Sequence, residues 1–265
     1  MNDPLEVMLA TALGIIVMMV AMWVVSLFLR NASVVDIAWG AGFVLVAWIA
    51  RMVGDGHNGR STLLTAMVTI WGLRLAGHLW WRSRGAAEDF RYQSMRRRQR
   101  EHFPLRSLVT VFGLQGLLMF IVSLPVQLAA TARYPDIGWI AVVGVVLWGI
   151  GFFFETVGDA QLAQFRADTA NDGMVLDRGL WRYSRHPNYF GDCCIWWGIF
   201  LVTAETGAAW FGLIGPVAMS YLLINVSGVA MLERGLRKRR DGYPEYVART
   251  SMFFPRRPSS VDEDA

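Results

Sequence analysis

The segment EVMLATALGIIVMMVAMWVVSLFL, residues 6–29, decides the fold class of this chain. After Glu6 it contains no charged residue, and it exceeds the roughly 20 apolar residues with which a helix crosses the hydrocarbon core of a bilayer. The residues before it include Asp3, where a cleaved signal peptide would begin with basic residues. We therefore expect a membrane-spanning helix here.

The composition extends this expectation to the whole chain. Of 265 residues, 54% are hydrophobic and 17% are charged, and the mean hydropathy is +0.36. Soluble chains carry charge on about a quarter of their residues, so a soluble globular enzyme and a disordered chain are both excluded. The two cysteines, Cys193 and Cys194, are neighbours in an apolar stretch, which excludes a disulfide framework and a cysteine-based metal site. We expect no metal.

Seven apolar stretches have spanning length, and they predict an all-α polytopic membrane protein with seven transmembrane helices. They are residues 6–29, 33–53, 61–82, 107–130, 137–157, 188–206 and 209–232. The sixth has a short apolar core, because Asn188, Tyr189 and Asp192 occupy its first turns. The polar tail 259–265 is expected to be disordered.

Basic residues predict the orientation of these spans. Most of the 25 Lys and Arg residues follow the first, third, fifth and seventh spans. Connections rich in Lys and Arg stay on the cytoplasmic side, so we expect the N-terminus outside and the C-terminus in the cytoplasm. The formal net charge of +4 then reflects topology. We expect contact with membrane lipids, and neither nucleic-acid binding nor an obligate protein partner.

Ionisable side chains inside spans are costly in a bilayer, which makes each of them a functional candidate. They are Asp36, Arg74, His78, Glu155, Asp159 and Asp192. In the expected topology all of them lie in the cytoplasmic halves of their helices, which suggests a polar cavity open to the cytoplasm. The alternative is that they pair with one another or extend to the interface.

The connection between the fifth and sixth spans alternates arginines, aromatic rings and hydrogen-bonding side chains, as in GLWRYSRHPNYFGD at residues 179–192. Guanidinium groups bind phosphates, aromatic rings stack on adenine, and amides or carboxylates bind ribose and carboxamide groups. The pattern therefore predicts a dinucleotide site. No G-x-G-x-x-G motif follows a strand, so we expect helix ends and loops to form it. The alternative is a basic aromatic loop among lipid headgroups.

The strings RHPNYFGD at residues 185–192 and GYPEY at residues 242–246 resemble the C-terminal domain of the steroid 5-alpha-reductase family, in particular its bacterial branch. The resemblance is close over the C-terminal half and loose over the N-terminal half. It implies one seven-helix domain over residues 1–258, with the substrate side mainly in residues 1–130 and NADPH bound by residues 150–258. It also implies a multi-pass protein of the bacterial inner membrane whose cofactor site faces the cytoplasm.

The resemblance implies that NADPH contacts the fifth span, the connection after it and the late Tyr-Pro motif. These cofactor candidates are Asp159, Arg166, Arg178, Arg182, Tyr183, Arg185, His186, Asn188, Tyr189, Asp192, Tyr243 and Tyr246. Of these, Asp159, Asn188, Asp192 and Tyr243 correspond to family contacts. The arginines are candidates for the pyrophosphate and the 2′-phosphate.

The catalytic candidates are Asp36, His78 and Tyr92. Asp36 occupies the place of the family's acid, a Glu early in the second span that holds a steroid 3-ketone. An ungapped alignment puts Trp71 at the place of the family's catalytic Tyr. Because Trp cannot act as an acid, either the register of this alignment is off or His78 or Tyr92 takes that role. The alternative for Asp36 is that it caps a solvated start of the second span.

The implied activity is NADPH-dependent reduction of the C4=C5 double bond of a 3-oxo-Δ4-steroid, or of a related lipid enone. Hydride adds to C5 while a buried acid polarises the 3-ketone, and the apolar substrate enters from the bilayer. Relatives of the motif also occur in isoprenylcysteine and phospholipid methyltransferases, so a methyltransferase that uses S-adenosylmethionine is the first alternative. That cofactor has no phosphate, and the arginine cluster counts against it. The second alternative is a non-catalytic lipid-binding or transport protein.

Overall fold

The computed structural model describes residues 3–54, 59–131, 137–206, 209–226, 229, 233 and 242–259. Every element in these residues is helical. The chain divides into two compact units, which we describe one at a time. Unit 1 comprises Met1–Val142 and Ile199–Gly215, and unit 2 comprises Val143–Gly198 and Pro216–Ala265. The expected single domain over residues 1–258 stays a prediction.

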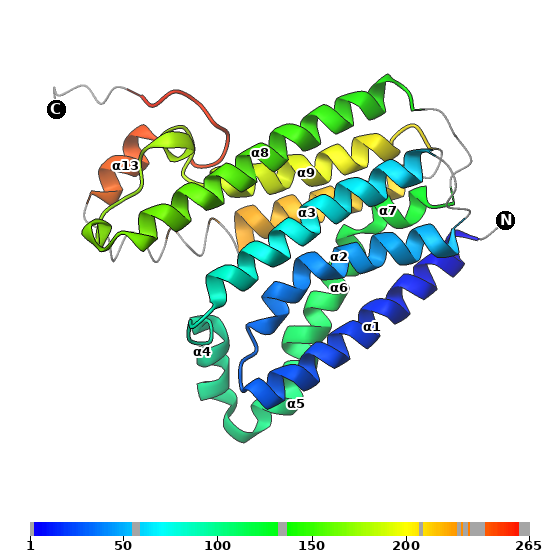
Figure 1. Cartoon of the computed structure of the whole chain (residues 1–265), viewed down its shortest axis with the longest axis horizontal. Coiled ribbons are helices and arrows are strands. Elements are labelled where there is room, and N and C mark those ends of the chain that lie inside the picture. Colours follow the sequence, from blue (N-terminus) through cyan, green and yellow to red (C-terminus); the bar gives the residue numbers. More distant parts are fainter. Residues whose placement is uncertain are drawn as a thin grey trace. The chain divides into compact units, whose positions relative to one another are not determined.

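Five helical stretches are long and apolar enough to cross a membrane. They are α1 (Pro4–Leu29), α2 (Val34–Val53), α3 (Gly59–Ser83), the stretch Phe90–Val122 and α8 (Trp139–Ala167) (Figure 1). They overlap the first five expected spans, which confirms that the described residues are all helical and include five candidate membrane spans. In the described residues α9 (Pro187–Thr203) and the apolar helical stretch Trp210–Val226 are shorter. The sixth and seventh spans, and the orientation that depends on them, stay predictions.

The fourth stretch is assembled from several short elements. They are α4 (Phe90–Gln99), η1 (Arg100–His102), α5 (Phe103–Ser107), the π-helical η2 (Leu108–Gly113) and α6 (Leu114–Val122). It ends at Ser123, because Pro125 has no N–H to donate to the preceding turn. The chain resumes as α7 (Leu124–Ala129). The expected span over residues 107–130 therefore differs from the structure, since it continues through this break.

In unit 1, α1, α2 and α3 pack side by side (Figure 1). The closest approach joins Gly40 of α2 to Gly72 of α3. A Cβ on Gly40 would lie 2.4 Å from the Gly72 carbonyl oxygen, and a Cβ on Gly72 would lie 2.5 Å from that of Gly40. Small residues let helices approach closely in a bilayer, where van der Waals contact drives their packing.

A buried ion pair joins distant parts of unit 1. Arg60, in the first turn of α3, is 1% exposed, and its guanidinium lies 2.9 Å from the Glu205 carboxylate. Glu205 also accepts from the backbone N–H groups of Gly138 and Ile140, both at 3.1 Å. Burial raises the pKa of Glu205, but these hydrogen bonds outweigh it and leave the pKa below its usual value. Arg60, which lies between the second and third expected spans, is therefore part of the packed unit.

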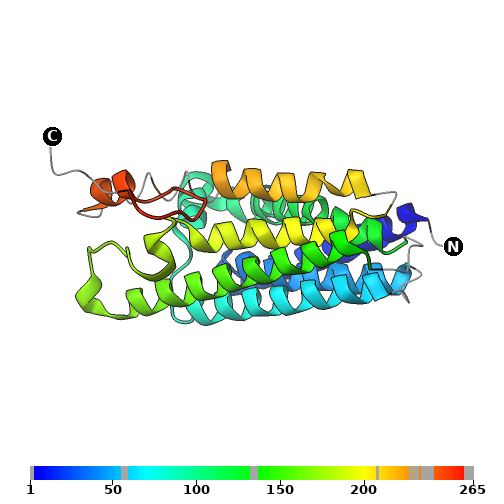
Figure 2. The ribbon, with the colours of Figure 1, turned by 90° about the horizontal axis from the view of Figure 1, so that it is seen from above.

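In unit 2, α8 and α9 run side by side in opposite directions (Figure 2). Glycines on α8 at seven-residue spacing face α9. A Cβ on Gly151 would lie 2.5 Å from the Gly191 carbonyl oxygen, and a Cβ on Gly158 would lie 3.2 Å from the Asn188 nitrogen. These close approaches place Asn188, at the start of α9, against the C-terminal half of α8.

The C-terminal part of unit 2 folds back on the connection after α8. The Arg185 N–H donates to the Ser251 carbonyl at 2.8 Å, and the Ser184 hydroxyl donates to the Phe253 carbonyl at 2.8 Å. Ser259 donates its N–H to the Arg249 carbonyl at 3.0 Å, and the rest of the expected tail, residues 260–265, lies outside the described residues. The remaining elements are η3 (Thr169–Asn171), η4 (Gly179–Arg182), α10 (Ala209–Gly212), α11 (Ile214–Tyr221), the π-helical η5 (Leu222–Val226) and α13 (Tyr243–Arg249).

Candidate functional site

Asp36 lies in the first turn of α2, and α4 brings two side chains to it. The Tyr92 hydroxyl donates to Asp36 Oδ1 at 2.7 Å, and the Arg91 guanidinium donates to Asp36 Oδ2 at 2.9 Å. Tyr92 is 5% exposed, whereas 26% of the Asp36 side chain is exposed. Two of the three catalytic candidates therefore meet directly. We call Asp36, Arg91 and Tyr92 the Asp36 cluster.

Carboxylates in the turn before α4 hold this arrangement. Asp89 caps α4 by accepting from the Arg91 N–H at 2.9 Å, and its own N–H donates to the Ser33 hydroxyl at 2.8 Å. Glu88 accepts from the Ala32 N–H at 2.8 Å. Because Ala32 and Ser33 immediately precede α2, these hydrogen bonds fix the start of α4 against the start of α2.

Both carboxylates stay ionised at neutral pH. Burial raises the pKa of Glu88, but hydrogen bonds from Arg96 and from the Ala32 N–H bring that pKa below its usual value. Burial also raises the pKa of Asp89, and hydrogen bonds from the Arg91 side chain and N–H outweigh it in the same way. The contacts that hold α4 are therefore charged hydrogen bonds, which are stronger than neutral ones.

The Asp36 cluster places a hydroxyl donor beside a carboxylate and a guanidinium. The Tyr92 hydroxyl is able to donate either to Asp36 or to a carbonyl oxygen that comes within reach. Donors aimed at such an oxygen stabilise the negative charge that develops on it during reaction. The cluster is thus suited to polarising a carbonyl group or moving a proton.

The third catalytic candidate, His78, lies on α3. Its described ring contact is with Trp81, at 6.2 Å between ring centroids. Trp71, which occupies the family Tyr position in the ungapped alignment, is fully buried and packs on Phe43 at 5.5 Å between centroids. Trp71 is therefore a packing residue, and Tyr92 is the candidate that reaches Asp36.

In unit 2, the structure brings together two cofactor candidates, Asp159 and Asn188. The Asn188 side-chain amide donates to Asp159 Oδ1 at 3.0 Å. The Oδ1 atom of Asn188 is buried and has no hydrogen-bond partner among the residues that the structure describes. Buried polar atoms are nearly always paired, so this oxygen suits a donor supplied by a ligand. The carboxamide NH₂ of a nicotinamide is one such donor, so Asp159 and Asn188 have the chemistry to hold that group.

Arg185 and His186 form a buried ion cluster with Glu233. Arg185 Nε lies 2.8 Å from Glu233 Oε1, and His186 Nε2 lies 3.4 Å from the same oxygen. Arg185 also donates to the carbonyls of Val247 and Thr250 at 3.1 and 2.6 Å. Burial raises the pKa of Glu233, but the hydrogen bonds from His186 and Arg185 lower it to about 2. Burial lowers the pKa of His186. The described contacts of these two cofactor candidates therefore hold the C-terminal segment in place.

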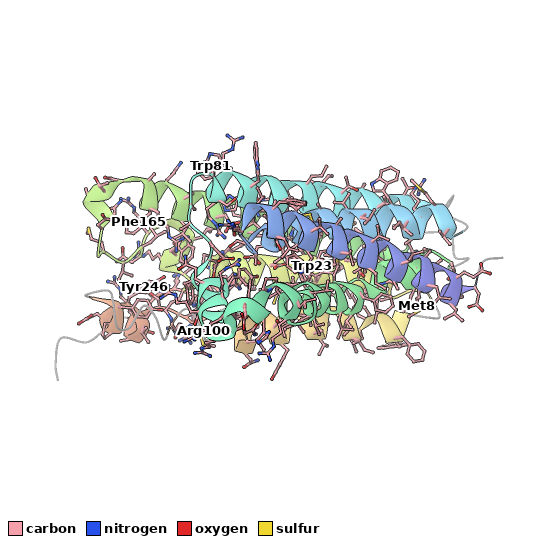
Figure 3. The ribbon with its side chains drawn as sticks, turned by 90° about the horizontal axis from the view of Figure 1, so that it is seen from below. Met8, Trp23, Trp81, Arg100, Phe165 and Tyr246 are labelled. Atoms are coloured by element: carbon pink, nitrogen blue, oxygen red, sulfur yellow. The ribbon has the colours of Figure 1, made fainter. Side chains whose placement is uncertain are left out.

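The two tyrosines of the late Tyr-Pro motif are buried, and Tyr246 has a described structural contact. The Tyr246 hydroxyl, on α13 (Figure 3), donates to the Trp181 carbonyl, and the Trp181 indole N–H donates to the Gly158 carbonyl at 3.1 Å. Trp181 thus links α13 to α8. Burial raises the pKa of Tyr246, so its hydroxyl stays protonated and able to donate.

Of the other cofactor candidates, four are exposed and two lie on α9. Arg166, Arg178, Arg182 and Tyr183 are exposed. The Arg178 guanidinium lies over the Phe165 ring, 6.0 Å from its centroid. Tyr189 stacks on His186 with ring centroids 5.6 Å apart, and Asp192 lies one turn after Asn188 on α9. These arginines therefore lie at the surface, where an anionic ligand can reach them.

A family model described as "Protein of unknown function (DUF1295)" matches residues 22–250, which include the Asp36 cluster and the Asp159–Asn188 pair. The chain belongs to the DUF1295 family. "Uncharacterized protein C594.04c" of Schizosaccharomyces pombe is 26% identical over 285 residues, which cover 92% of this chain and 79% of that relative. No solved structure matches the chain.

The DUF1295 match corrects the resemblance to the steroid 5-alpha-reductase family, which is wrong as a family assignment. The DUF1295 model spans both strings on which that resemblance depends, and the comparisons do not name the reductase family. The structure supplies a physical reason. Arg185 and His186 pair with Glu233, and Tyr246 binds the Trp181 carbonyl, so parts of both strings serve packing within unit 2.

Two residues of these clusters, Arg91 and Glu233, were not identified from the sequence. Arg91 stands beside Tyr92 in the string EDFRY, and an arginine next to a phenol candidate was a usable signal for a partner of Asp36. Glu233 follows the last apolar stretch, among residues that are mainly basic. Its isolation as an acid there was a weaker signal for a buried ion pair.

Proposed function

We propose that this DUF1295 protein is a membrane-bound NADPH-dependent reductase that saturates the C=C bond of a lipid-soluble enone. The C4=C5 bond of a 3-oxo-Δ4-steroid is the substrate class of the proposal. The observation that carries it is the direct hydrogen bond between Tyr92 and Asp36, which sets a buried hydroxyl donor at the end of an apolar helix. The apolar substrate enters from the bilayer.

In this proposal Tyr92 donates to the enone oxygen while negative charge develops on it. NADPH held in unit 2 would supply the hydride that the β-carbon of the enone takes up. Asp36 orients the Tyr92 hydroxyl, and Arg91, 2.9 Å from Asp36, keeps that carboxylate in place. Water then protonates the α-carbon, so that the product gains two hydrogens. Electrostatic stabilisation of this kind is commonly the largest contribution to catalysis.

The residues proposed to hold NADPH lie in unit 2. Asp159 and Asn188 would bind the carboxamide, because the Asn188 oxygen is buried without a described partner. The exposed Arg166, Arg178 and Arg182 would bind the pyrophosphate and the 2′-phosphate, which guanidinium groups recognise in a bidentate manner.

The proposal includes seven spans, with the N-terminus outside and the C-terminus in the cytoplasm of a bacterium. The distribution of Lys and Arg supports this topology. The helices α9 and Trp210–Val226 supply the sixth and seventh spans, although both are shorter than the others. The cofactor site then faces the cytoplasm, where NADPH is available.

Thermal midpoints in detergent test the cofactor assignment. A ligand at 100 times its dissociation constant stabilises a protein by about 2.7 kcal/mol, which raises the midpoint measurably. We expect NADPH to raise the midpoint of the wild-type protein and S-adenosylmethionine to leave it unchanged. Stabilisation by S-adenosylmethionine alone would replace the reductase with a methyltransferase. If neither ligand acts, a lipid-binding or transport role is favoured.

A further inference from the structure

The segment between α3 and α6 carries more arginines than its own acidic residues neutralise. Two arginines are engaged inside unit 1. Arg91 pairs with Asp36 and Asp89, both at 2.9 Å, and Arg96 pairs with Glu88 at 2.8 Å. These pairs hold α4 in place and use the carboxylates nearest to it.

Five further arginines of this segment are exposed. Arg97 donates to the Gln93 side chain and Arg84 lies over the Trp80 ring, and the other three are Arg98, Arg100 and Arg106. Among the residues that the structure describes, none of the three has a recorded ion pair or side-chain hydrogen bond. We call these three residues the arginine patch. Arg100 has φ of 49°, in the left-handed region that residues other than glycine rarely adopt. Such conformations persist where surrounding structure imposes them, and they are common at binding sites.

Exposed apolar side chains adjoin the arginine patch. Arg106 is followed on the same stretch by Val109, Leu114 and Leu117, and preceded by Leu105, all between 50% and 74% exposed. The stretch is one of those long and apolar enough to span a membrane, so these exposed side chains are suited to contact with lipid tails. Arg98 and Arg100 precede these apolar side chains, and Arg106 lies between Leu105 and Val109. The charges therefore lie at the N-terminal end of the apolar run, where phospholipid headgroups would meet it.

A tryptophan on α1 marks the same level. The Trp23 indole N–H donates to the Pro104 carbonyl at 2.8 Å, at the start of α5, and Figure 3 labels Trp23 and Arg100. Tryptophan is enriched at membrane–water interfaces, where the ring is among tails and the N–H meets polar groups. The arginine patch is therefore placed to meet headgroup phosphates.

We propose that the arginine patch is a binding site for an anionic phospholipid. The headgroup phosphate binds Arg98, Arg100 and Arg106, and one acyl chain lies along Leu105 and Val109. Phosphatidylcholine carries a phosphate as well, but its quaternary ammonium cancels the headgroup charge and repels the arginines, so a headgroup with a net negative charge is favoured. A lipid is favoured over free phosphate because exposed apolar side chains adjoin the charges, and only a lipid uses both.

The experiment titrates purified protein in dodecylmaltoside micelles with dioleoylphosphatidylglycerol or dioleoylphosphatidylcholine and follows the thermal midpoint. The test variant carries Arg98→Gln and Arg106→Gln, and the matched control carries Arg256→Gln and Arg257→Gln, two exposed arginines of unit 2. We expect the wild type and the control to respond to phosphatidylglycerol at lower concentration than to phosphatidylcholine. One basic residue near a membrane surface changes affinity roughly five-fold, so the test variant, which loses two, should bind phosphatidylglycerol about 25-fold more weakly.

A second variant with Arg98→Lys and Arg106→Lys retains both charges and should retain most of the preference for phosphatidylglycerol. It keeps the experiment decisive if the Gln variant fails to fold. Three results would overturn the proposal. These are equal responses to the two lipids, equal losses in the test and control variants, and displacement of phosphatidylglycerol by inorganic phosphate at low millimolar concentration. The last result would indicate a site for free phosphate.

Discussion

Replacing Tyr92 by Phe removes one hydroxyl group and leaves a ring that is 5% exposed in place. The deleted hydrogen bond, 2.7 Å long, ends on a carboxylate. Hydrogen bonds to charged groups contribute about 1.5–3 kcal/mol to stability. Asp36 keeps its contact with Arg91 at 2.9 Å and is partly exposed to water, so we expect a loss near the lower limit, about 1.5 kcal/mol.

The effect on turnover should be much larger than the effect on stability. Removal of one donor to a developing oxyanion lowers kcat roughly 100- to 1000-fold. A loss of about 1.5 kcal/mol leaves a typical domain folded, because native stabilities are about 5–15 kcal/mol. Tyr92→Phe should therefore remain folded, bind NADPH with unchanged affinity and lose most of its turnover.

The assay follows NADPH oxidation at 340 nm with a saturating enone, alongside the thermal midpoint of each variant. The matched control is Tyr221→Phe, since Tyr221 is 61% exposed on α11 and loses the same hydroxyl. The control should retain wild-type turnover. Wild-type turnover in Tyr92→Phe would refute the role of Tyr92 as the donor, and equal losses in both variants would point to a general effect on folding.

Three further predictions concern unit 2. Asn188→Ala should weaken NADPH binding roughly ten-fold by isothermal titration, because a hydrogen bond of about 1.4 kcal/mol is lost, and an unchanged dissociation constant would exclude Asn188 from the cofactor site. Gly151→Ala should destabilise the protein by about 1–3 kcal/mol, because its Cβ would lie 2.5 Å from a backbone oxygen of α9. Gly149→Ala should leave the stability unchanged, because a Cβ on Gly149 would meet no neighbouring atom of the described residues within 4 Å. Equal thermal midpoints for the two variants would contradict the packing of α8 on α9. The pKa of Glu233 is lowered from 4.5 to about 2, so its contribution to stability is complete above 4.5 and lost as the pH falls towards 2. Burial lowers the pKa of His186, so His186 also destabilises the fold as the pH falls below 6.5. The thermal midpoint of Glu233→Gln should vary less with pH between 5 and 2 than that of the wild type, and parallel curves would show that Glu233 is not the group responsible.

The spanning helices could be predicted from the sequence because the free energy of membrane insertion accumulates residue by residue along one segment. The first five expected spans overlap five apolar helical stretches for this reason. The break at Ser123 was harder to predict, since a proline such as Pro125 is often tolerated inside a membrane helix. The burial of Arg60 could not be predicted, because its partner Glu205 is 145 positions away.

The candidate site shows the same division. Asp36 and Tyr92 could be predicted as candidates, because a carboxylate in an apolar span is costly and a phenol is one of the few side chains that can act as an acid. Their contact could not be predicted, since it joins residues 56 positions apart and depends on the hydrogen bond from Asp89 to Ser33 that fixes α4. Arg185 illustrates the opposite case. Its residue type predicts a phosphate ligand, but the folded chain brings a carboxylate and two backbone carbonyls to it.

The central claim is that the protein transfers hydride from NADPH to an enone. The most direct measurement incubates purified protein with progesterone, a 3-oxo-Δ4-steroid, and NADPH deuterated at the transferring C4 position, and reads the mass of the product. We predict a product that gains one deuterium from the cofactor and one ordinary hydrogen from water, with loss of this product in Tyr92→Phe. Unchanged steroid in the presence of protein that NADPH stabilises would contradict the substrate class. A product without deuterium would contradict hydride transfer itself.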